Sequence, residues 1–305
     1  MIAGRPAAER SMAGPLLDPA LLRRLEQLSL VNRRRLASSN KGERRSVRRG
    51  SSLEFVDYRQ YSPGDDLRQI DWNVYGRHNH LVLKLFEDEE VLSVHLLLDK
   101  SRSMDWGAPN KLLYSRQVAA ALGYVALTGY DNVEVLQFST KGQEHFGPGR
   151  GRSGIAGLFR FLGNDGQPAG NTDLDGSLRA FAARPRVPGL VLLFTDLLDP
   201  GGYEHALVRL RQQRHEVLLF HVLCAEELRP TVEGDLRLVD RESGEAVEVT
   251  LDRRALDAYH ERLTTWLAGV AGFCRRHSIG YQPLDSSRPL PQLLFRDLRE
   301  RGVLT

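Results

Sequence analysis

Apolar residues follow two different periods along most of the chain. From residue 91 onward, short and nearly continuous apolar runs predict buried strands over residues 91–99, 132–140, 189–199, 216–225 and 279–285. Between these runs, apolar residues recur at helical spacing and predict helices over 111–129, 153–163, 176–184, 203–213 and 252–277. Strands that are apolar on both faces and alternate with helices are typical of a parallel sheet covered on two sides. The pattern predicts an α/β fold with an open, mostly parallel, Rossmann-type sheet and helices on both faces.

The remaining segments lack this alternation. Leucines at near-helical spacing predict an amphipathic helix over 19–36, and a polar, basic stretch follows at 38–52. Residues 231–250 are typical of a β-hairpin. We therefore expect four parts: a basic N-terminal tail, helix and arm (1–50), a segment packed on the sheet (51–90), the sheet domain (91–285) and a C-terminal helix or tail (286–305).

Composition narrows the possible environments. The 305 residues are 41% hydrophobic and 27% charged, with a net charge of +3, which is ordinary for a globular protein. The two cysteines, Cys224 and Cys274, lie far apart in the chain, which argues against a disulfide scaffold and fits a reducing compartment. The N-terminus lacks the apolar core of a signal peptide, and no apolar run approaches the roughly 20 residues of a membrane span. We expect a cytoplasmic protein without a membrane span.

Oxygen-bearing side chains stand where the predicted strands end. In LLLDKSRSMDWG, Asp99, Ser101 and Ser103 follow an apolar run at alternate positions. Thr172 lies at a loop-to-helix junction, and Asp196 comes directly after another apolar run. Carboxyl ends of parallel strands form ligand sites, and hard oxygen ligands suit Mg²⁺. The alternative is that the hydroxyls cap helices or close turns and that Asp196 is a solvated acid.

These five residues resemble the metal-ion-dependent adhesion site of von Willebrand factor A domains. Asp99, Ser101 and Ser103 match its DxSxS motif, while Thr172 and Asp196 match its distant threonine and aspartate. The resemblance implies a von Willebrand factor A-like sheet with one divalent cation, Mg²⁺ or alternatively Mn²⁺ or Ca²⁺. It also implies an open coordination position that an acidic side chain of a partner can fill.

A second motif precedes the sheet domain. Residues 54–77 are similar to the signature of the bacterial domain of unknown function 58, whose matching positions here are Glu54, Arg59, Tyr61, Gly64, Asp65, Arg68, Asp71, Trp72 and Arg77. Arginine–carboxylate pairs with aromatic cover could fix this segment on the sheet, so we interpret these residues as structural rather than catalytic. The resemblance covers about residues 40–285 and implies a non-enzymatic adaptor that works with a MoxR-type AAA+ ATPase in assembly, maturation or stress response.

Two other functions remain open from the sequence. A metal-dependent hydrolase or phosphatase would use Asp99 as its nucleophile, but the chain shows no nucleophile elbow, P-loop or HExxH motif. A nucleic-acid binder would use the arginine-rich arm at 33–49, which can neutralise phosphates but contains no aromatic residue on which bases could stack. Both are kept as alternatives to the interaction module.

Overall fold

The computed structural model describes residues 15–31, 53–88, 91–164, 170–231, 234–240 and 244–305. The chain divides into two compact units. One combines α1 (Pro19–Leu25) with the residues from 92 to the C-terminus, and the other lies within residues 33–91. Within the described residues, no helix is long and apolar enough to cross a membrane.

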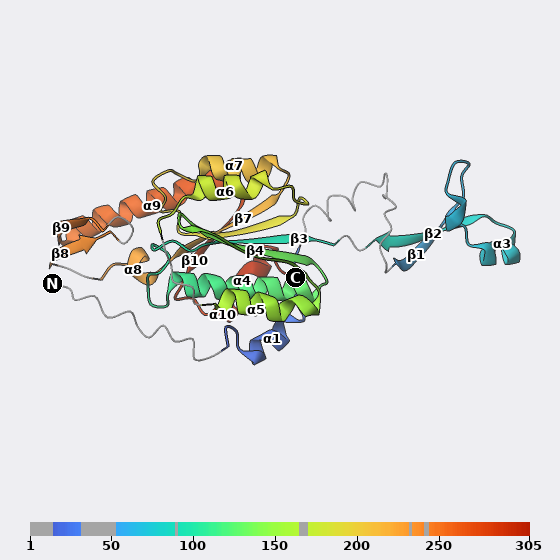
Figure 1. Cartoon of the computed structure of the whole chain (residues 1–305), viewed down its shortest axis with the longest axis horizontal. Coiled ribbons are helices and arrows are strands. Elements are labelled where there is room, and N and C mark those ends of the chain that lie inside the picture. The colour runs from blue at the N-terminus through green and yellow to red at the C-terminus, as the bar shows by residue number, and fades with distance from the viewer. Residues whose placement is uncertain (1–14, 32–52, 89–90, 165–169, 232–233, 241–243) are drawn as a thin grey trace. The chain divides into compact units, whose positions relative to one another are not determined.

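A six-stranded sheet forms the centre of the larger unit, in the order β10-β7-β6-β3-β4-β5 (Figure 1). Its strands are β3 (Ser93–Asp99), β4 (Asn132–Ser139), β5 (Gly142–Arg150), β6 (Leu190–Thr195), β7 (Glu216–Leu223) and β10 (Gly280–Asp285). All neighbours pair in parallel except β4 and β5, which pair antiparallel. The predicted mostly parallel α/β fold is therefore confirmed.

Helices cover both faces of this sheet (Figure 1). One core contains α4 (Lys111–Thr128) and α5 (Ile155–Gly163), and the other contains α6 (Leu174–Ala183), α7 (Glu204–Gln212) and the C-terminal part of α9 (Arg253–Arg276). The central strands face both cores, which is why every residue of β6 is buried. Fifteen of the 18 residues of α4 are buried, so this helix lies in the core rather than on the surface.

The N-terminal helix is shorter than predicted. Helix α1 covers Pro19–Leu25, not 19–36, and it begins at Asp18, whose carboxylate accepts a hydrogen bond from the Ala20 N–H. Leu28 is buried although it lies beyond the helix, and Leu30 forms a β-bridge with Leu304. The leucine spacing therefore reflects packing against the sheet unit, including its C-terminal turns α10 (Leu290–Gln292), η3 (Leu293–Asp297) and α11 (Leu298–Glu300).

Several elements have no counterpart among the predictions. The edge strand β5, the short turns η2 (Arg152–Gly154) and α8 (Ala225–Leu228), and the helix α3 (Trp72–His78) carry little apolar periodicity. The predicted hairpin is present as β8 (Gly234–Val239) paired antiparallel with β9 (Ala246–Leu251).

The smaller unit is built on a second antiparallel hairpin. Strands β1 (Leu53–Gln60) and β2 (Val82–Asp88) pair with each other, and η1 (Leu67–Gln69) and α3 lie in the connection between them. Gly64 has a φ of 106°, which the turn at 62–65 requires and which side-chain-bearing residues rarely adopt.

Candidate metal centre

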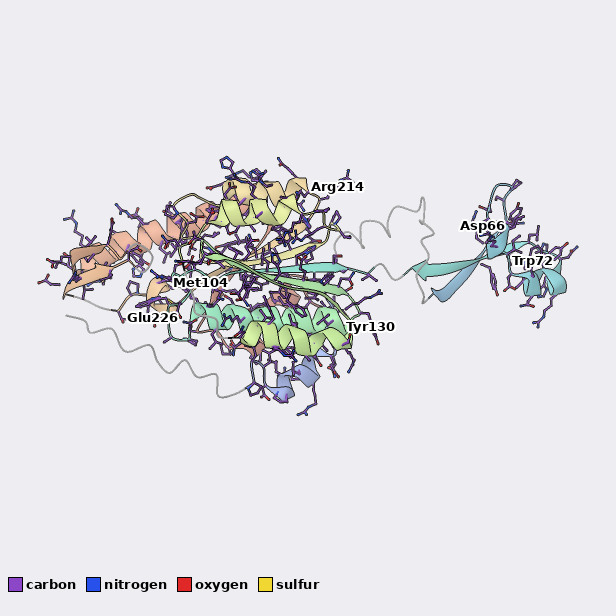
Figure 2. The ribbon with its side chains drawn as sticks, viewed as in Figure 1. Asp66, Trp72, Met104, Tyr130, Arg214 and Glu226 are labelled. Carbon is purple, nitrogen blue, oxygen red and sulfur yellow. The ribbon has the colours of Figure 1, made fainter. Side chains whose placement is uncertain are left out.

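The candidate ligands meet at the carboxyl ends of β3 and β6. Asp99 is the last residue of β3, and Asp196 directly follows β6, the strand beside it. Figure 2 shows Met104 and Glu226 at this end of the sheet, whereas Tyr130 and Arg214 lie at the opposite end. Parallel neighbours bring residues 97 positions apart in the sequence to one edge, as the sequence predicted.

Asp99 is fully buried, and its contacts are with neutral donors. One carboxylate oxygen accepts the Ser101 N–H at 2.9 Å, and the other accepts the Thr195 hydroxyl at 2.8 Å. Among the described residues, no cationic side chain lies within ion-pair distance of this carboxylate. Burial, and next the charge of Asp196, raise the pKa of Asp99 well above its ordinary value. A carboxylate in this position is stabilised when a cation approaches it.

The two serines face each other in the turn after β3. Their hydroxyl oxygens are 2.9 Å apart, and Ser101 is fully buried. Neither hydroxyl caps α4, because Asn110 caps that helix through the Leu113 N–H. The serines therefore do not cap α4, whereas the hydrogen bond between their hydroxyls lies within the turn, as the turn-closing alternative also expects.

The loop that carries Thr172 lies against this turn. The Arg102 N–H donates to the Gly170 carbonyl at 3.2 Å, and Thr172, two residues further on, is 6% exposed. The cap of α6 is Asp173, which accepts the Gly176 N–H at 2.9 Å. Thr172 is therefore not the cap of this helix. The structure gathers the three segments that the sequence singled out.

Asp196 differs from Asp99 because it has a cationic partner. One of its oxygens accepts a hydrogen bond from the Lys111 ammonium at 2.8 Å, and both side chains are fully buried. Lys111 also donates to Glu227 at 2.6 Å. Burial lowers the pKa of Lys111, but the charges of Asp196 and Glu227 outweigh it and raise the pKa, so the ammonium stays charged.

The backbone after Asp196 is held in an unusual conformation. Leu197 is buried and has a φ of 57°, in the left-handed region that disfavours side chains. Its N–H donates to the Thr195 hydroxyl at 3.1 Å, and the Leu198 N–H donates to Asp196 at 3.2 Å. Strain of this kind persists where surrounding contacts fix it, and it is common at functional sites.

His221 supports the same loop from β7. Its Nε2 lies 3.1 Å from the Asp196 carbonyl oxygen, and its Nδ1 lies 3.0 Å from the Tyr281 hydroxyl. Burial lowers the pKa of His221 to about 4, so the ring is neutral near pH 7. A carbonyl can only accept, so Nε2 carries the proton and Nδ1 accepts from Tyr281.

The donor chemistry fits a hard cation. Within the described part of the chain, no group of three or more His, Cys, Asp or Glu side chains could hold a metal ion. An ion at the carboxyl ends of β3 and β6 would therefore depend on the two carboxylates of Asp99 and Asp196 together with serine and threonine hydroxyls. Oxygen donors of this type suit Mg²⁺, Mn²⁺ or Ca²⁺ and not zinc.

The signature residues organise the smaller unit. Arg59 donates to Asp65 at 2.7 Å, and this hydrogen bond is the main cause that lowers the pKa of Asp65. Asp71 begins α3 by accepting the Asn73 N–H at 2.9 Å and also accepts the Tyr58 hydroxyl. Trp72, the first residue of α3, is 60% exposed, and its ring packs edge-on against Tyr75.

The other signature positions have less specific contacts. Tyr61 donates its N–H to the Leu81 carbonyl between the two strands of the hairpin. Arg68 lies in η1, and Arg77 is exposed in the last turn of α3. Glu54 lies on β1.

Comparison with family models places the chain among known sequences. The family described as "Protein of unknown function DUF58" matches residues 57–265, which is more than half of the chain. The chain belongs to this family. Curated relatives include the Uncharacterized protein Mb1516 of Mycobacterium bovis and the Uncharacterized protein Rv1480 of Mycobacterium tuberculosis, each 28% identical over 264 residues, covering 85% of this chain and 83% of the relative.

Solved structures similar to this chain have low sequence identity. The conserved hypothetical protein BatB from Bacteroides thetaiotaomicron is 13% identical, covers 70% of this chain and 97% of its own, and gives a TM-score of 0.42. An aerotolerance-related membrane protein from Bacteroides fragilis is 15% identical, covers 68% and 99%, and gives 0.41. The SpRpn10 VWA domain is 13% identical, covers 69% and 95%, and gives 0.36.

Sequence reasoning missed Lys111 and Glu227. The signal for Lys111 was its place at the start of a helix that is apolar on all sides, where a charged side chain has to be buried and paired. No sequence signal identified its partners, because Asp196 and Glu227 lie 85 and 116 positions away.

Proposed function

We propose that this protein is a non-enzymatic interaction module that binds a divalent cation at the carboxyl ends of β3 and β6. Asp99, Ser101, Ser103, Thr172 and Asp196 would hold Mg²⁺, or alternatively Mn²⁺ or Ca²⁺. With few carboxylates around it the ion keeps residual positive charge, which attracts an acidic side chain of a protein partner. The sequence resemblance supports a MoxR-type AAA+ ATPase as that partner, in assembly, maturation or stress response.

The state of Asp99 is the observation that supports this proposal most directly. A buried carboxylate that meets only neutral donors is costly, and natural sites of this kind are stabilised by a counter-ion. Two serine hydroxyls and the loop of Thr172 lie beside it, and these are groups that can complete a hard-cation site.

Cation titration of the full chain tests the site. In isothermal titration calorimetry we expect Mn²⁺ to bind the parent protein and not to bind Asp99→Ala. The circular dichroism spectrum of the variant should match that of the parent, which shows that the fold is intact. The matched control is Asp257→Ala, which removes an exposed acid on α9 and should leave binding unchanged. Binding of Mn²⁺ to Asp99→Ala with the parent's affinity would show that the site is wrongly assigned.

Capture of the partner is measured separately. Tagged protein is used as bait with Mg²⁺ or with a chelator, and co-purifying proteins are identified by mass spectrometry. We expect an AAA+ ATPase that is retained with Mg²⁺, released by chelator and lost with Asp99→Ala. If the ATPase is retained equally in chelator and with Asp99→Ala, the cation has no role in docking.

The two alternatives receive no specific support from the structure. A cavity of about 560 Å³ lies among α6, α7 and α9, and its lining does not include Asp99. Asp99 itself is fully buried with both oxygens hydrogen-bonded, which is an unfavourable start for a nucleophile. The arginine-rich arm of the nucleic-acid alternative lies outside the described residues.

A further inference from the structure

We propose that Lys111 is a built-in cation that competes with the divalent ion for Asp196, so that the ion binds by displacing the ammonium from this carboxylate. This inference rests on the proposed cation site and concerns its regulation. It assigns to Lys111 and Glu227 a function that neither the family signature nor the adhesion-type motif contains.

The position of Lys111 carries the first step. It is the first residue of α4, yet it is fully buried, and its ammonium reaches across to the end of β6. There it lies 2.8 Å from the carboxylate of Asp196, itself one of the five candidate ligands. An ammonium and a divalent ion that share one carboxylate repel each other, and at buried sites this repulsion is weakly screened.

The two candidate carboxylates are therefore unequal. Asp196 is neutralised by Lys111, whereas the described contacts of Asp99 are with the neutral donors Ser101 and Thr195. A divalent ion gains the full attraction of Asp99, but it gains that of Asp196 only when Lys111 withdraws. The affinity of the site for the ion is consequently set by how firmly Lys111 is held on Asp196.

Glu227 provides the position to which Lys111 can withdraw. One of its oxygens accepts the ammonium at 2.6 Å, and the other accepts the Cys224 N–H at 2.9 Å, which fixes the carboxylate. The carbonyl of Glu227 accepts the Tyr259 hydroxyl from α9. Lys111 can thus give up Asp196 and keep a counter-charge, and this exchange connects the cation site to α8 and α9.

The test uses two variants with opposite expected effects. Lys111→Met frees Asp196, and we expect Mn²⁺ to bind at least about tenfold tighter than to the parent, as measured by calorimetry at constant pH and salt. Glu227→Gln leaves Asp196 as the main counter-charge of Lys111, and we expect binding to weaken about threefold or more. A purely structural role of the two residues would weaken binding in both variants.

The charge-matched control is Lys100→Met. Lys100 is also buried and lies inside the motif, between Asp99 and Ser101, but its ammonium is paired with Glu144 on β5 at 2.7 Å. We expect its removal to change Mn²⁺ affinity by less than about twofold, which separates competition for Asp196 from a general loss of positive charge.

Protein stability gives a second readout. Lys111→Met leaves Asp196 buried without its counter-charge, so we expect a lower melting temperature in chelator and a larger Mn²⁺-induced rise in it than the parent shows. If Lys111→Met does not fold, the inference is tested with Glu227→Gln alone. In that case, a Mn²⁺ affinity of Glu227→Gln equal to that of the parent overturns the inference.

The outcomes distinguish this inference from the proposed function. Equal Mn²⁺ affinity of the parent, Lys111→Met and Glu227→Gln overturns the competition and leaves the cation site in place. Weaker binding in both variants also overturns it. Absence of Mn²⁺ binding in the parent and in all variants overturns the cation site and the competition together.

Discussion

Replacement of Glu134 by Gln tests how the sheet is held at the end opposite the candidate metal centre. Glu134 lies on β4, where Arg186 donates to both of its oxygens at 2.9 and 3.0 Å and the His95 ring lies 3.2 Å away. These contacts fix the segment around Arg186, which leads into β6 and so toward Asp196. Loss of the carboxylate charge should therefore destabilise the entry to that strand.

The size of the effect follows from the pKa of Glu134. Burial raises this pKa, but hydrogen bonds from His95 and Arg186 outweigh it and lower the pKa from 4.5 to about 2. At ~1.4 kcal/mol for each tenfold change in proton affinity, this difference corresponds to ~3 kcal/mol of folding free energy. The side chain is 19% exposed, so solvent screening removes little of it.

The sign of the pH dependence is determined by the lowered pKa. The stabilisation is fully present above pH ~4.5, where the unfolded chain also carries the charge, and it is lost as the pH falls toward 2. In urea unfolding at pH 7 we expect Glu134→Gln to be ~3 kcal/mol less stable than the parent. At pH 3 the difference in unfolding free energy should shrink to ~1.5 kcal/mol, because the parent has then lost about half of this contribution while the Gln variant lacks it at every pH.

An exposed acid provides the control. Glu300→Gln removes a carboxylate that is 66% exposed and pairs with Arg296 one helical turn away, and its effect should stay below ~0.5 kcal/mol at both pH values. The interpretation of Glu134 is refuted if Glu134→Gln lowers the free energy of unfolding by less than ~1 kcal/mol at pH 7. It is also refuted if the difference in unfolding free energy between parent and variant is the same at pH 3 as at pH 7.

Two further substitutions test close contacts between β3 and β6, one at each end of these strands. Gly189→Ala should destabilise the protein by more than ~3 kcal/mol in urea unfolding, because the new Cβ would lie 1.9 Å from the Ser93 carbonyl oxygen. The control is Gly269→Ala on α9, where the new Cβ meets no atom within 4 Å, and this variant should be as stable as the parent or slightly more stable. Thr195→Val should lower the free energy of unfolding by ~2 kcal/mol, because it removes a donor to Asp99 and the acceptor of the Leu197 N–H. Thr195→Ser keeps both hydrogen bonds, so equal melting temperatures of the two variants would contradict this prediction.

The strands and helices of the sheet unit could be predicted because burial on both faces leaves a clear pattern. Strand β6 is buried at every position, and its apolar run marks both its length and its end at Thr195. Strand β5 could not be predicted in this way, because most of its nine residues are exposed, and three of the nine are glycines and one is a proline. Its position depends on backbone pairing with β4, to which side-chain periodicity gives no clue.

The N-terminal helix and α3 show two different limits. Leu28 is buried in a non-helical segment, so its spacing from Leu21 and Leu25 extended the predicted helix beyond its real end. In α3 no residue is buried, so there was no periodic pattern to detect. The structural cue is instead the carboxylate of Asp71, which accepts the first free N–H groups of the helix.

The candidate site could be located from the sequence, but its charge balance could not. The positions of Asp99 and Asp196 follow from the ends of two neighbouring strands, and strand ends can be read from apolar runs. The difference between these two carboxylates depends on whether a cationic side chain reaches them, and this is decided by where α4 begins. Lys111 is the first residue of α4, and its ammonium lies 2.8 Å from the Asp196 carboxylate. The chemistry of this edge is therefore set by the register of one helix against the sheet, a property of tertiary packing that no motif records.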